Sequence, residues 1–374
     1  KASTSSRLQM IINAAVAISP DKPFQLKKFE LEEPREDEVL VKIVASGICH
    51  TDIAVKEQSV HLPLPMILGH EGSGIVEDIG KNVTELEIGD HVILTSDSCG
   101  LCKKCEQKLP SYCNEFVERN LSGKRIDGTS PILDAIDSRI GGRFVGQSSF
   151  ASHSLVSQRS AIKIDKSHPL RLMGPLGCGL MTGVGTVFHA LEASSGNSIA
   201  IFGAGTVGLS SVMGSILKNC DPIIVVDPIK ERREIAINLG ATHALDPKTE
   251  NVAEQIIDIS KGGVDYSIEA SGVPAAVNMS LKCLGRPGWS AQVGATPAQT
   301  YHSLDMDHIG FGRGIKGVVM GDAYAKEFVP HLASLHREGK LPFEKFVKEY
   351  KFDEINTAVH ESQQGSVIKP ILIM

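Results

Sequence analysis

Four cysteines lie close together in the sequence and form the strongest candidate for a metal site. Their spacing is Cys99-x2-Cys102-x2-Cys105-x7-Cys113. Four thiolates at such spacing can converge on one tetrahedral zinc ion, with sulfur–zinc distances of about 2.3 Å. A complete set of four protein ligands leaves no position for water or substrate. The sequence therefore predicts a structural zinc here rather than a catalytic one.

Other interpretations of this quartet stay open. Disulfide pairs would suit a secreted chain. An iron–sulfur cluster uses similar spacing, but its usual run has a proline after the last cysteine, where this chain has Asn114. A zinc ribbon that binds nucleic acid is the functional rival. The segment carries Lys103, Lys104 and Lys108, but no aromatic residue lies between these lysines to stack on a base.

A second candidate metal site is dispersed along the chain: Cys49 in GICHTD, His70 in GHEG and Cys178 in GCG. Two cysteines and one histidine with an open fourth position are one pattern of a catalytic zinc. Each residue alone more often has a structural role. Asp52 is placed to orient His70 through its second ring nitrogen, and Glu71 is an acidic neighbour that can enter the coordination shell.

Glycines flank the three candidate ligands in the sequence. Because glycine has no side chain, several backbone segments can approach one another closely at such positions. The flanking glycines are Gly47, Gly69, Gly72, Gly177 and Gly179. This setting favours the metal interpretation over three unrelated core residues.

A glycine-rich turn marks a third site, for a dinucleotide. Gly203, Gly205 and Gly208 (GAGTVG) follow a predicted strand at 198–202 and open a predicted helix at 206–218. The first glycine makes the turn, the second lets the backbone approach a pyrophosphate, and the third packs helix on strand. The pyrophosphate would lie at the helix N-terminus.

Asp227 stands nineteen residues after Gly208, at the end of a predicted strand at 222–226. A carboxylate there hydrogen-bonds the adenosine ribose and repels a 2′-phosphate, so the sequence predicts NAD rather than NADP. Arg232 and Arg233 follow closely and would soften this preference if they faced the ribose.

The elements that must position these residues fall into two parts. Up to about residue 165 the chain is β-rich, with predicted strands at 39–45, 73–79 and 91–94. From residue 198 short apolar strands alternate with helices, which indicates βαβ units and a parallel sheet. The series includes strands at 266–270 and 290–293 and a helix at 230–239.

Beyond residue 320 the pattern changes again. Two helices are predicted, at 325–337 and 353–363, followed by a strand at 369–373 that returns to the first domain. We therefore predict an α/β protein. Its catalytic, zinc-binding domain comprises 1–180 and 321–374, and its dinucleotide-binding domain, a doubly wound parallel sheet, comprises 181–320.

Composition excludes several classes of function. The chain has 374 residues and a formal charge of −6, so binding to a polyphosphate backbone is disfavoured. No run approaches 18 consecutive apolar residues, which rules out a membrane helix. Lys1 and Arg7 before residues 10–17 faintly mimic a signal peptide, but a first strand is predicted instead. Thiolates that bind metal must stay reduced, which favours the cytoplasm.

With these motifs in order along the chain, the sequence resembles the zinc-dependent alcohol dehydrogenases of the medium-chain dehydrogenase/reductase superfamily. The resemblance covers nearly the whole chain and rests on GICHTD, LGHEGSGIVEDIG, the cysteine quartet, GCG, GAGTVG with Asp227, and SVIKPILIM. It implies a β-rich GroES-like catalytic domain and a Rossmann cofactor domain. The stretch from Phe144 and the GPLGCG segment look most like aryl (benzyl) alcohol dehydrogenases.

The resemblance also implies a role for each matched residue. Cys49, His70 and Cys178 would hold the catalytic zinc, with Glu71 behind it, and Thr51 would take the alcohol proton. Further matched positions would bind the cofactor or line the substrate pocket. For the cofactor these are His50 and Lys369 near the pyrophosphate, Asp227 and Arg232 at the ribose, and Val293; for the pocket, Val60, Phe144, Ala295 and Val319.

One position departs from the best-known members of the family. Liver- and yeast-type enzymes have a histidine five residues after the first zinc cysteine, which relays the proton to solvent, and Ala54 stands there in this chain. Without that histidine, Thr51, the nicotinamide ribose and water would have to carry the proton to solvent.

The implied activity is reversible, zinc-dependent oxidation of a primary, benzyl-type alcohol to its aldehyde, with NAD and two zinc ions per subunit. A glutathione-dependent formaldehyde dehydrogenase, a general aliphatic alcohol dehydrogenase, and an NAD- and zinc-binding protein without catalysis are the alternatives. The expected partners are a small alcohol or aldehyde and further copies of the chain in a homodimer or homotetramer.

Overall fold

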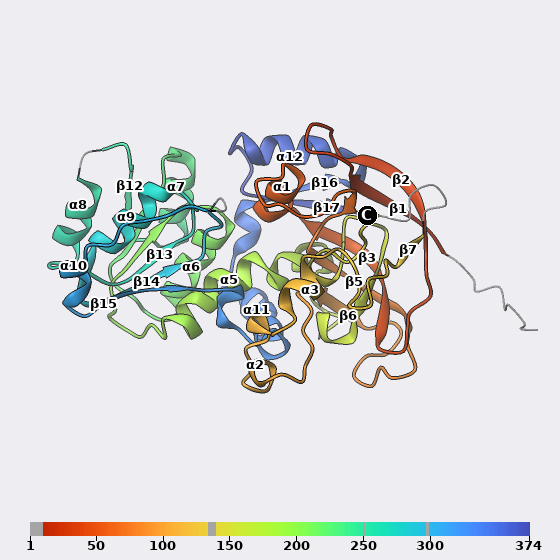
Figure 1. Ribbon diagram of the computed structural model, residues 1–374. Coiled ribbons are helices and arrows are strands. Elements are labelled where there is room, and N and C mark those ends of the chain that lie inside the picture. Colours follow the sequence, from red (N-terminus) through yellow and green to blue (C-terminus); the bar gives the residue numbers. More distant parts are fainter. Residues whose placement is uncertain (1–9, 134–139, 250, 297–298) are drawn as a thin grey trace, which may run out of the picture. The chain divides into compact units, whose positions relative to one another are not determined.

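The computed structural model describes residues 10–133, 140–249, 251–296 and 299–374, so Lys1 and Arg7 lie outside it. The chain divides into two compact units (Figure 1). The first unit comprises Lys1–Cys178, Tyr324–Ala333 and Val347–Met374, and the second comprises Gly179–Ala323 and Ser334–Phe346. The expected division differs from this one at 179–180, 321–323 and 334–346, which it placed in the first domain.

The second unit contains a six-stranded parallel sheet in the order β12-β11-β10-β13-β14-β15. Counted within the unit, this order is 3-2-1-4-5-6, the order of doubly wound dinucleotide-binding folds. The strands are β10 (Ile199–Phe202), β11 (Ile223–Val226), β12 (His243–Leu245), β13 (Val264–Glu269), β14 (Leu284–Gln292) and β15 (Arg313–Gly317). Every residue of β10 and β11 is buried, as in parallel strands that are covered on both faces.

Helices accompany this sheet. They are α5 (Gly179–Gly185), α6 (Thr206–Leu217), α7 (Lys230–Leu239), α8 (Val252–Ile259), α9 (Pro274–Lys282) and α10 (Met306–Gly310). The predicted strands at 198–202 and 222–226 and the helix at 206–218 are confirmed to within one residue. Strand β14 begins six residues before its predicted start, because Gly285, Pro287 and Gly288 are poor strand formers and hid its first half from the sequence pattern.

Two sheets form most of the first unit. A seven-stranded sheet has the order β16-β17-β3-β5-β6-β9, with β8 also paired to β3. Its strands are β3 (Glu38–Gly47), β5 (Glu71–Ile79), β6 (His91–Leu94), β8 (His153–Ser157), β9 (Ala161–Ile164), β16 (Val347–Lys351) and β17 (Lys369–Ile373). The C-terminal strand β17 pairs with β3, which confirms that the end of the chain returns to the first unit.

The second sheet of this unit has the order β4-β1-β2-β7. Its strands are β1 (Met10–Ala17), β2 (Gln25–Leu31), β4 (Met66–Ile67) and β7 (Ile132–Leu133). Strand β1 pairs with both β2 and β4, as the strand interpretation of residues 10–17 predicted. The remaining helices are α1 (His50–Lys56), α2 (Lys103–Glu106), α3 (Phe116–Asn120), α4 (Leu170–Met173), α11 (Ala325–Arg337) and α12 (Ile355–Gln363).

Strands β3 and β5 position the second candidate metal site. They are antiparallel neighbours, and their register sets Gly47 opposite Glu71. The residues just outside these strand ends, Cys49 and His70, are thereby brought side by side. Among the helices of the described residues, none has the length and apolar character that a membrane span requires.

Candidate active site and metal centres

The dispersed cysteines and histidine come together in the first unit. Ligand atoms of Cys49, His70, Glu71 and Cys178 all lie within 4.8 Å of one another. Cys49 directly precedes helix α1, His70 directly precedes strand β5, and Cys178 follows a 3-10 turn at Gly174–Gly177. Two sulfurs and one imidazole nitrogen, with a carboxylate behind them, form a donor set that suits zinc.

Asp52 fixes two of these residues at once, as the sequence predicted for His70. One carboxylate oxygen accepts the backbone N–H of Cys49 at 2.8 Å. The other lies 2.9 Å from His70 Nδ1 and accepts the backbone N–H of Gly69 at 3.0 Å. Asp52 is only 1% exposed. The carboxylate therefore leaves Nε2 of His70 as the nitrogen that faces a metal.

Glu71 and Lys369 form a buried ion pair beside the cluster. Lys369 Nζ donates to Glu71 Oε2 at 2.7 Å and to the carbonyl of Ile48 at 3.0 Å. Burial raises the pKa of Glu71, whereas the carboxylate of Glu71 raises the pKa of Lys369 against the opposing effect of burial. Lys369 is 1% exposed. The sequence analysis did not predict this pairing with Glu71, and the expected role of Lys369 near the pyrophosphate stays a prediction.

Hydrogen bonds and charges within the cluster shift the pKa values of its residues. A hydrogen bond from Cys178 holds the pKa of the Cys49 thiol well below its usual range. Burial lowers the pKa of His70, but the charges of Asp52 and Cys49 outweigh it and raise that pKa. A thiolate and carboxylates thus gather around one buried point, which a divalent cation would neutralise.

The cysteine quartet also converges. The sulfurs of Cys99, Cys102, Cys105 and Cys113 all lie within 4.8 Å of one another. Backbone N–H groups point at these sulfurs: Cys102 N lies 3.3 Å from Cys99 Sγ, and Cys99 N lies 3.3 Å from Cys113 Sγ. Backbone N–H groups also lower the pKa of Cys102 to about 6. These contacts stabilise thiolates, the form that binds zinc.

We expect Cys102→Ser to destabilise the protein because it leaves a four-ligand site incomplete. Structural zinc sites have apparent binding free energies of about 10–16 kcal/mol in small peptides, so a loss of about 3 kcal/mol in stability is a modest expectation. It would lower Tm by roughly 6–12 °C in a domain of this size. Thermal unfolding measures the change, and Lys104→Ser, at an exposed position of the same segment, is the matched control. Equal Tm values for the two variants would contradict the prediction.

The glycine turn has the geometry of a phosphate cradle. Gly203 lies at φ +96°, a conformation that favours glycine, and a Cβ on Gly208 would collide with the carbonyl oxygen of Gly203. A Cβ on Gly205 would meet no atom within 4 Å. Open space at Gly205, at the start of helix α6, is where a pyrophosphate would approach the backbone.

Asp227 lies directly after strand β11 and is 4% exposed. Its carboxylate accepts the backbone N–H of Ala204 at 2.7 Å and that of Ile229 at 2.8 Å, which ties it to the glycine turn. Arg233 NH1 donates to the Asp227 carbonyl at 2.7 Å and lies 3.3 Å from Asp246. Arg233 is therefore held by the backbone of Asp227 and the carboxylate of Asp246, while Arg232 is half-buried on the same helix, α7.

Four further predicted residues lie in the first unit. Thr51 Oγ1 is 3.8 Å from Cys49 Sγ, and the adjacent His50 is exposed. Phe144 is fully buried, with its ring edge-on to His70 at 5.5 Å between centroids. Val60 is half-buried and packs against the apolar core of this unit.

The other three predicted residues belong to the second unit. Ala295 and Val319 are exposed, and Val293 donates its backbone N–H to the carbonyl of Glu269 at 2.9 Å, just beyond strand β14. The sequence analysis missed Gln147, which bonds the backbone on both sides of Glu71. The signal available in the sequence was this glutamine, a larger polar residue among the small residues that follow Phe144.

Comparison with known proteins places this geometry in a family. Residues 35–166 match the alcohol dehydrogenase GroES-like domain, and residues 206–335 match the zinc-binding dehydrogenase family. A geraniol dehydrogenase from Castellaniella defragrans is 37% identical over 96% of this chain and 97% of its own length.

Two solved structures are also similar to this chain. The benzyl alcohol dehydrogenase from Acinetobacter calcoaceticus is 41% identical with a TM-score of 0.94, over 98% of this chain and 99% of that one. An alcohol dehydrogenase zinc-binding domain protein from Burkholderia ambifaria is 42% identical with a TM-score of 0.96, over 98% and 100%. The chain therefore belongs to the zinc-type alcohol dehydrogenases of the medium-chain dehydrogenase/reductase superfamily. Its two ligand clusters and its glycine turn are consistent with two zinc ions and a nicotinamide cofactor.

Proposed function

We propose that this enzyme oxidises primary alcohols of the benzyl type to aldehydes, reversibly, with NAD as the hydride acceptor. The observation that carries the proposal is the ring of Phe144, which stands edge-on to His70 at the ligand cluster. This ring is fully buried beside His70, and in the proposal it would form the wall against which a bound substrate ring packs. Benzyl alcohol and geraniol, named in two similar proteins, share a carbinol carbon attached to an sp2 carbon, which supports the same substrate class.

Cys49, His70 and Cys178 would hold the catalytic zinc, and the quartet would hold the structural one. When bound, the zinc supplies Lewis acidity toward the alcohol or carbonyl oxygen, and the nicotinamide supplies the hydride acceptor. Asp52 keeps the imidazole of His70 and the backbone of Cys49 in place. Asp227 would bind the adenosine ribose and disfavour a 2′-phosphate.

Thr51 is the residue that we propose to accept the alcohol proton. Its hydroxyl lies beside Cys49, at the start of helix α1. Ala54, on the same helix, is buried and has no group that can carry a proton. The proton therefore leaves from Thr51 toward water, on the side where His50 is exposed.

A specificity profile tests the substrate class. A ring buries more apolar area than an ethyl group, at about 25 cal/mol per Å2, so the transition state for benzyl alcohol should be bound better by ~2 kcal/mol. This difference corresponds to roughly 30-fold in kcat/KM. We expect geraniol to fall close to benzyl alcohol and ethanol far below both.

The same assay separates the alternatives. Ethanol as good as benzyl alcohol would indicate a general aliphatic enzyme. Activity with formaldehyde only in the presence of glutathione would indicate the glutathione-dependent enzyme. Zinc and NADH binding without turnover of any alcohol would indicate a binding protein.

Asp227→Ser tests the proposed cofactor preference. The change removes a charged hydrogen-bond acceptor, worth about 1.5–3 kcal/mol, so kcat/KM for NAD should fall roughly 10- to 100-fold while activity with NADP rises. Arg232 and Arg233, both on helix α7 just beyond Asp227, would then supply positive charge beside a 2′-phosphate. Asp258→Ser, which removes an exposed carboxylate on helix α8 of the same unit, is the control, and equal use of NADP by the unchanged enzyme would contradict the preference.

A further inference from the structure

The segment from Arg143 to Ser148 has an unusual backbone. Val145, Gly146 and Ser148 lie at φ +46°, +70° and +56°, and two of these three are not glycine. Such conformations persist only where the surroundings fix them, and they often occur at functional sites. Ser148 Oγ provides part of this fixation, since it accepts the Phe144 N–H at 2.8 Å and donates to the Ile67 carbonyl at 2.6 Å.

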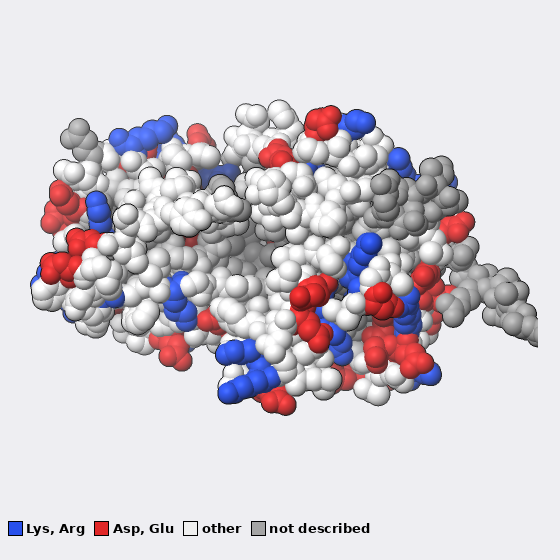
Figure 2. Space-filling view, viewed as in Figure 1, with Lys and Arg blue, Asp and Glu red and all other residues white. Residues whose placement is uncertain are grey.

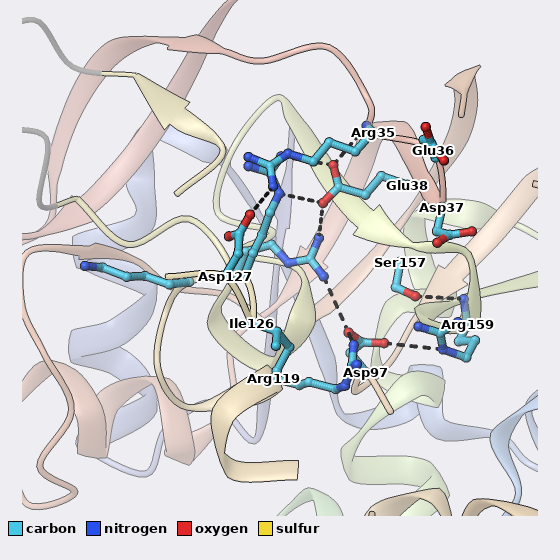
Figure 3. A pocket seen from close by; sticks show the side chains of 13 residues that line it. Arg35, Glu36, Asp37, Glu38, Asp97, Arg119, Ile126, Asp127, Ser157 and Arg159 are labelled. Carbon is cyan, nitrogen blue, oxygen red and sulfur yellow. Dashed lines mark hydrogen bonds and ion pairs between the residues drawn. The ribbon is translucent and has the colours of Figure 1, made fainter. Parts of the chain in front are cut away.

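An ion-pair cluster anchors the start of the segment (Figure 3). Arg143, 5% exposed, donates to Glu38 at 3.0 Å and lies 3.5 Å from Asp97. Arg125 binds the same glutamate through two nitrogens at 2.7 and 2.9 Å. The cavity beside them has a volume of about 480 Å3. Arg143 and the half-buried Arg125 both pair with Glu38, so these ion pairs join the chain at residue 143 to the start of strand β3.

Within this anchored segment, Gln147 is a residue that contacts the backbone of the ligand cluster. Its side chain is fully buried. Nε2 donates to the carbonyl of His70 at 2.9 Å, and Oε1 accepts the N–H of Gly72 at 3.1 Å. A Cβ on Gly72 would lie only 3.1 Å from that oxygen, so the glycine permits the approach. One amide thus spans the backbone on both sides of Glu71.

We propose that Gln147 is a positioning residue for the catalytic metal, holding the His70–Gly72 backbone so that the imidazole meets the two sulfurs. This inference rests on the proposed function, which assigns the metal to Cys49, His70 and Cys178. Asp52 fixes the ring of His70 at Nδ1, and Gln147 fixes its main chain. With both ends held, the ring has one orientation. Loss of such supporting contacts typically lowers metal affinity 10- to 100-fold.

The test measures metal retention at each cluster separately. The zinc-loaded enzyme is challenged with a chelator, and cysteine alkylation is followed over time by peptide mass spectrometry. Gln147→Met keeps the length of the side chain but removes both hydrogen bonds. We expect Cys49 and Cys178 to be alkylated roughly 10- to 100-fold faster in this variant, while the quartet at 99–113 keeps its wild-type rate. A changed visible spectrum of the cobalt-substituted enzyme should accompany the loss.

Asn356→Leu is the matched control. Asn356 is also an amide of the first unit that bonds one backbone segment twice, since it accepts the N–H of Phe24 at 2.9 Å and donates to the carbonyl of Phe24 at 3.0 Å. Its loss should lower Tm and leave Cys49 and Cys178 protected. If Gln147→Met does not fold, Gln147→Asn, whose amide is one methylene too short to span both backbone groups, is measured in the same way.

Three outcomes would overturn the inference. If Cys49 and Cys178 stayed as well protected from alkylation in the Gln147 variants as in the wild-type enzyme, and the cobalt spectrum were unchanged, the role of Gln147 would be refuted. The metal assignment would then still stand. If Cys49 and Cys178 were alkylated as fast in Asn356→Leu as in Gln147→Met, the effect would be general destabilisation rather than a role of Gln147. Alkylation of these two cysteines in the wild-type enzyme at the same rate with and without zinc would refute the metal assignment, and the proposed function with it.

Discussion

Cys178→Ser is expected to lower kcat/KM for benzyl alcohol at least about 1,000-fold, which corresponds to about 4 kcal/mol of transition-state stabilisation. The change removes one of the three ligands that meet at the cluster with Cys49 and His70. The fold should persist, because the structural quartet is untouched. Steady-state kinetics, metal content and NADH binding measure the three consequences: loss of turnover, loss of about one zinc per subunit, and retained cofactor binding.

The control for this variant is Cys220→Ser. Cys220 is a buried cysteine of the second unit that belongs to neither ligand cluster. It should keep its activity and both zinc ions. If Cys178→Ser retained wild-type kcat/KM, the assignment of the catalytic zinc would be wrong.

The second large effect is expected for Thr51→Ala, with a fall in kcat of roughly 100- to 1,000-fold, within the range that positioned proton transfer contributes. Helix α1 carries no second hydroxyl, and Ala54 stands where a proton-relay histidine would be. The loss should appear mainly in kcat, since Thr51 acts on the proton and the substrate body is held elsewhere. The kcat and KM of alcohol oxidation, measured across pH, test this.

Thr51→Ser is the matched variant, because it keeps the hydroxyl and loses only a methyl group. It should retain most of the activity. Thr51→Ala with more than a tenth of the wild-type kcat would exclude Thr51 as the proton acceptor and point to another exit route.

Much of the second unit could be predicted from local patterns. Short β-branched strands, a GAGTVG turn and an acidic residue after the next strand each depend on neighbours in the sequence. Strands that are buried on both faces consist of consecutive apolar residues, and such a run can be recognised in the sequence. The first half of β14 could not be predicted, because sheet pairing imposes strand geometry there on residues with low strand propensity.

The cysteine quartet was predictable for a similar reason. Its four ligands lie within fifteen residues, so spacing alone limits their geometry. The dispersed ligands were proposed from residue types, glycine neighbours and a family resemblance. Their meeting depends on the register of β3 against β5, which sets Gly47 opposite Glu71.

The sequence by itself determined the alternation of strands and helices, the cofactor turn and the four-thiolate site, since all of these are written in short-range spacing. Only the tertiary structure decided that Lys369 pairs with Glu71, 298 positions away, and that Gln147 spans the backbone beside His70. Such contacts form where distant strands converge and water is excluded. A buried charge or backbone group must then find a partner, and the fold, rather than the sequence neighbourhood, decides which residue is within reach.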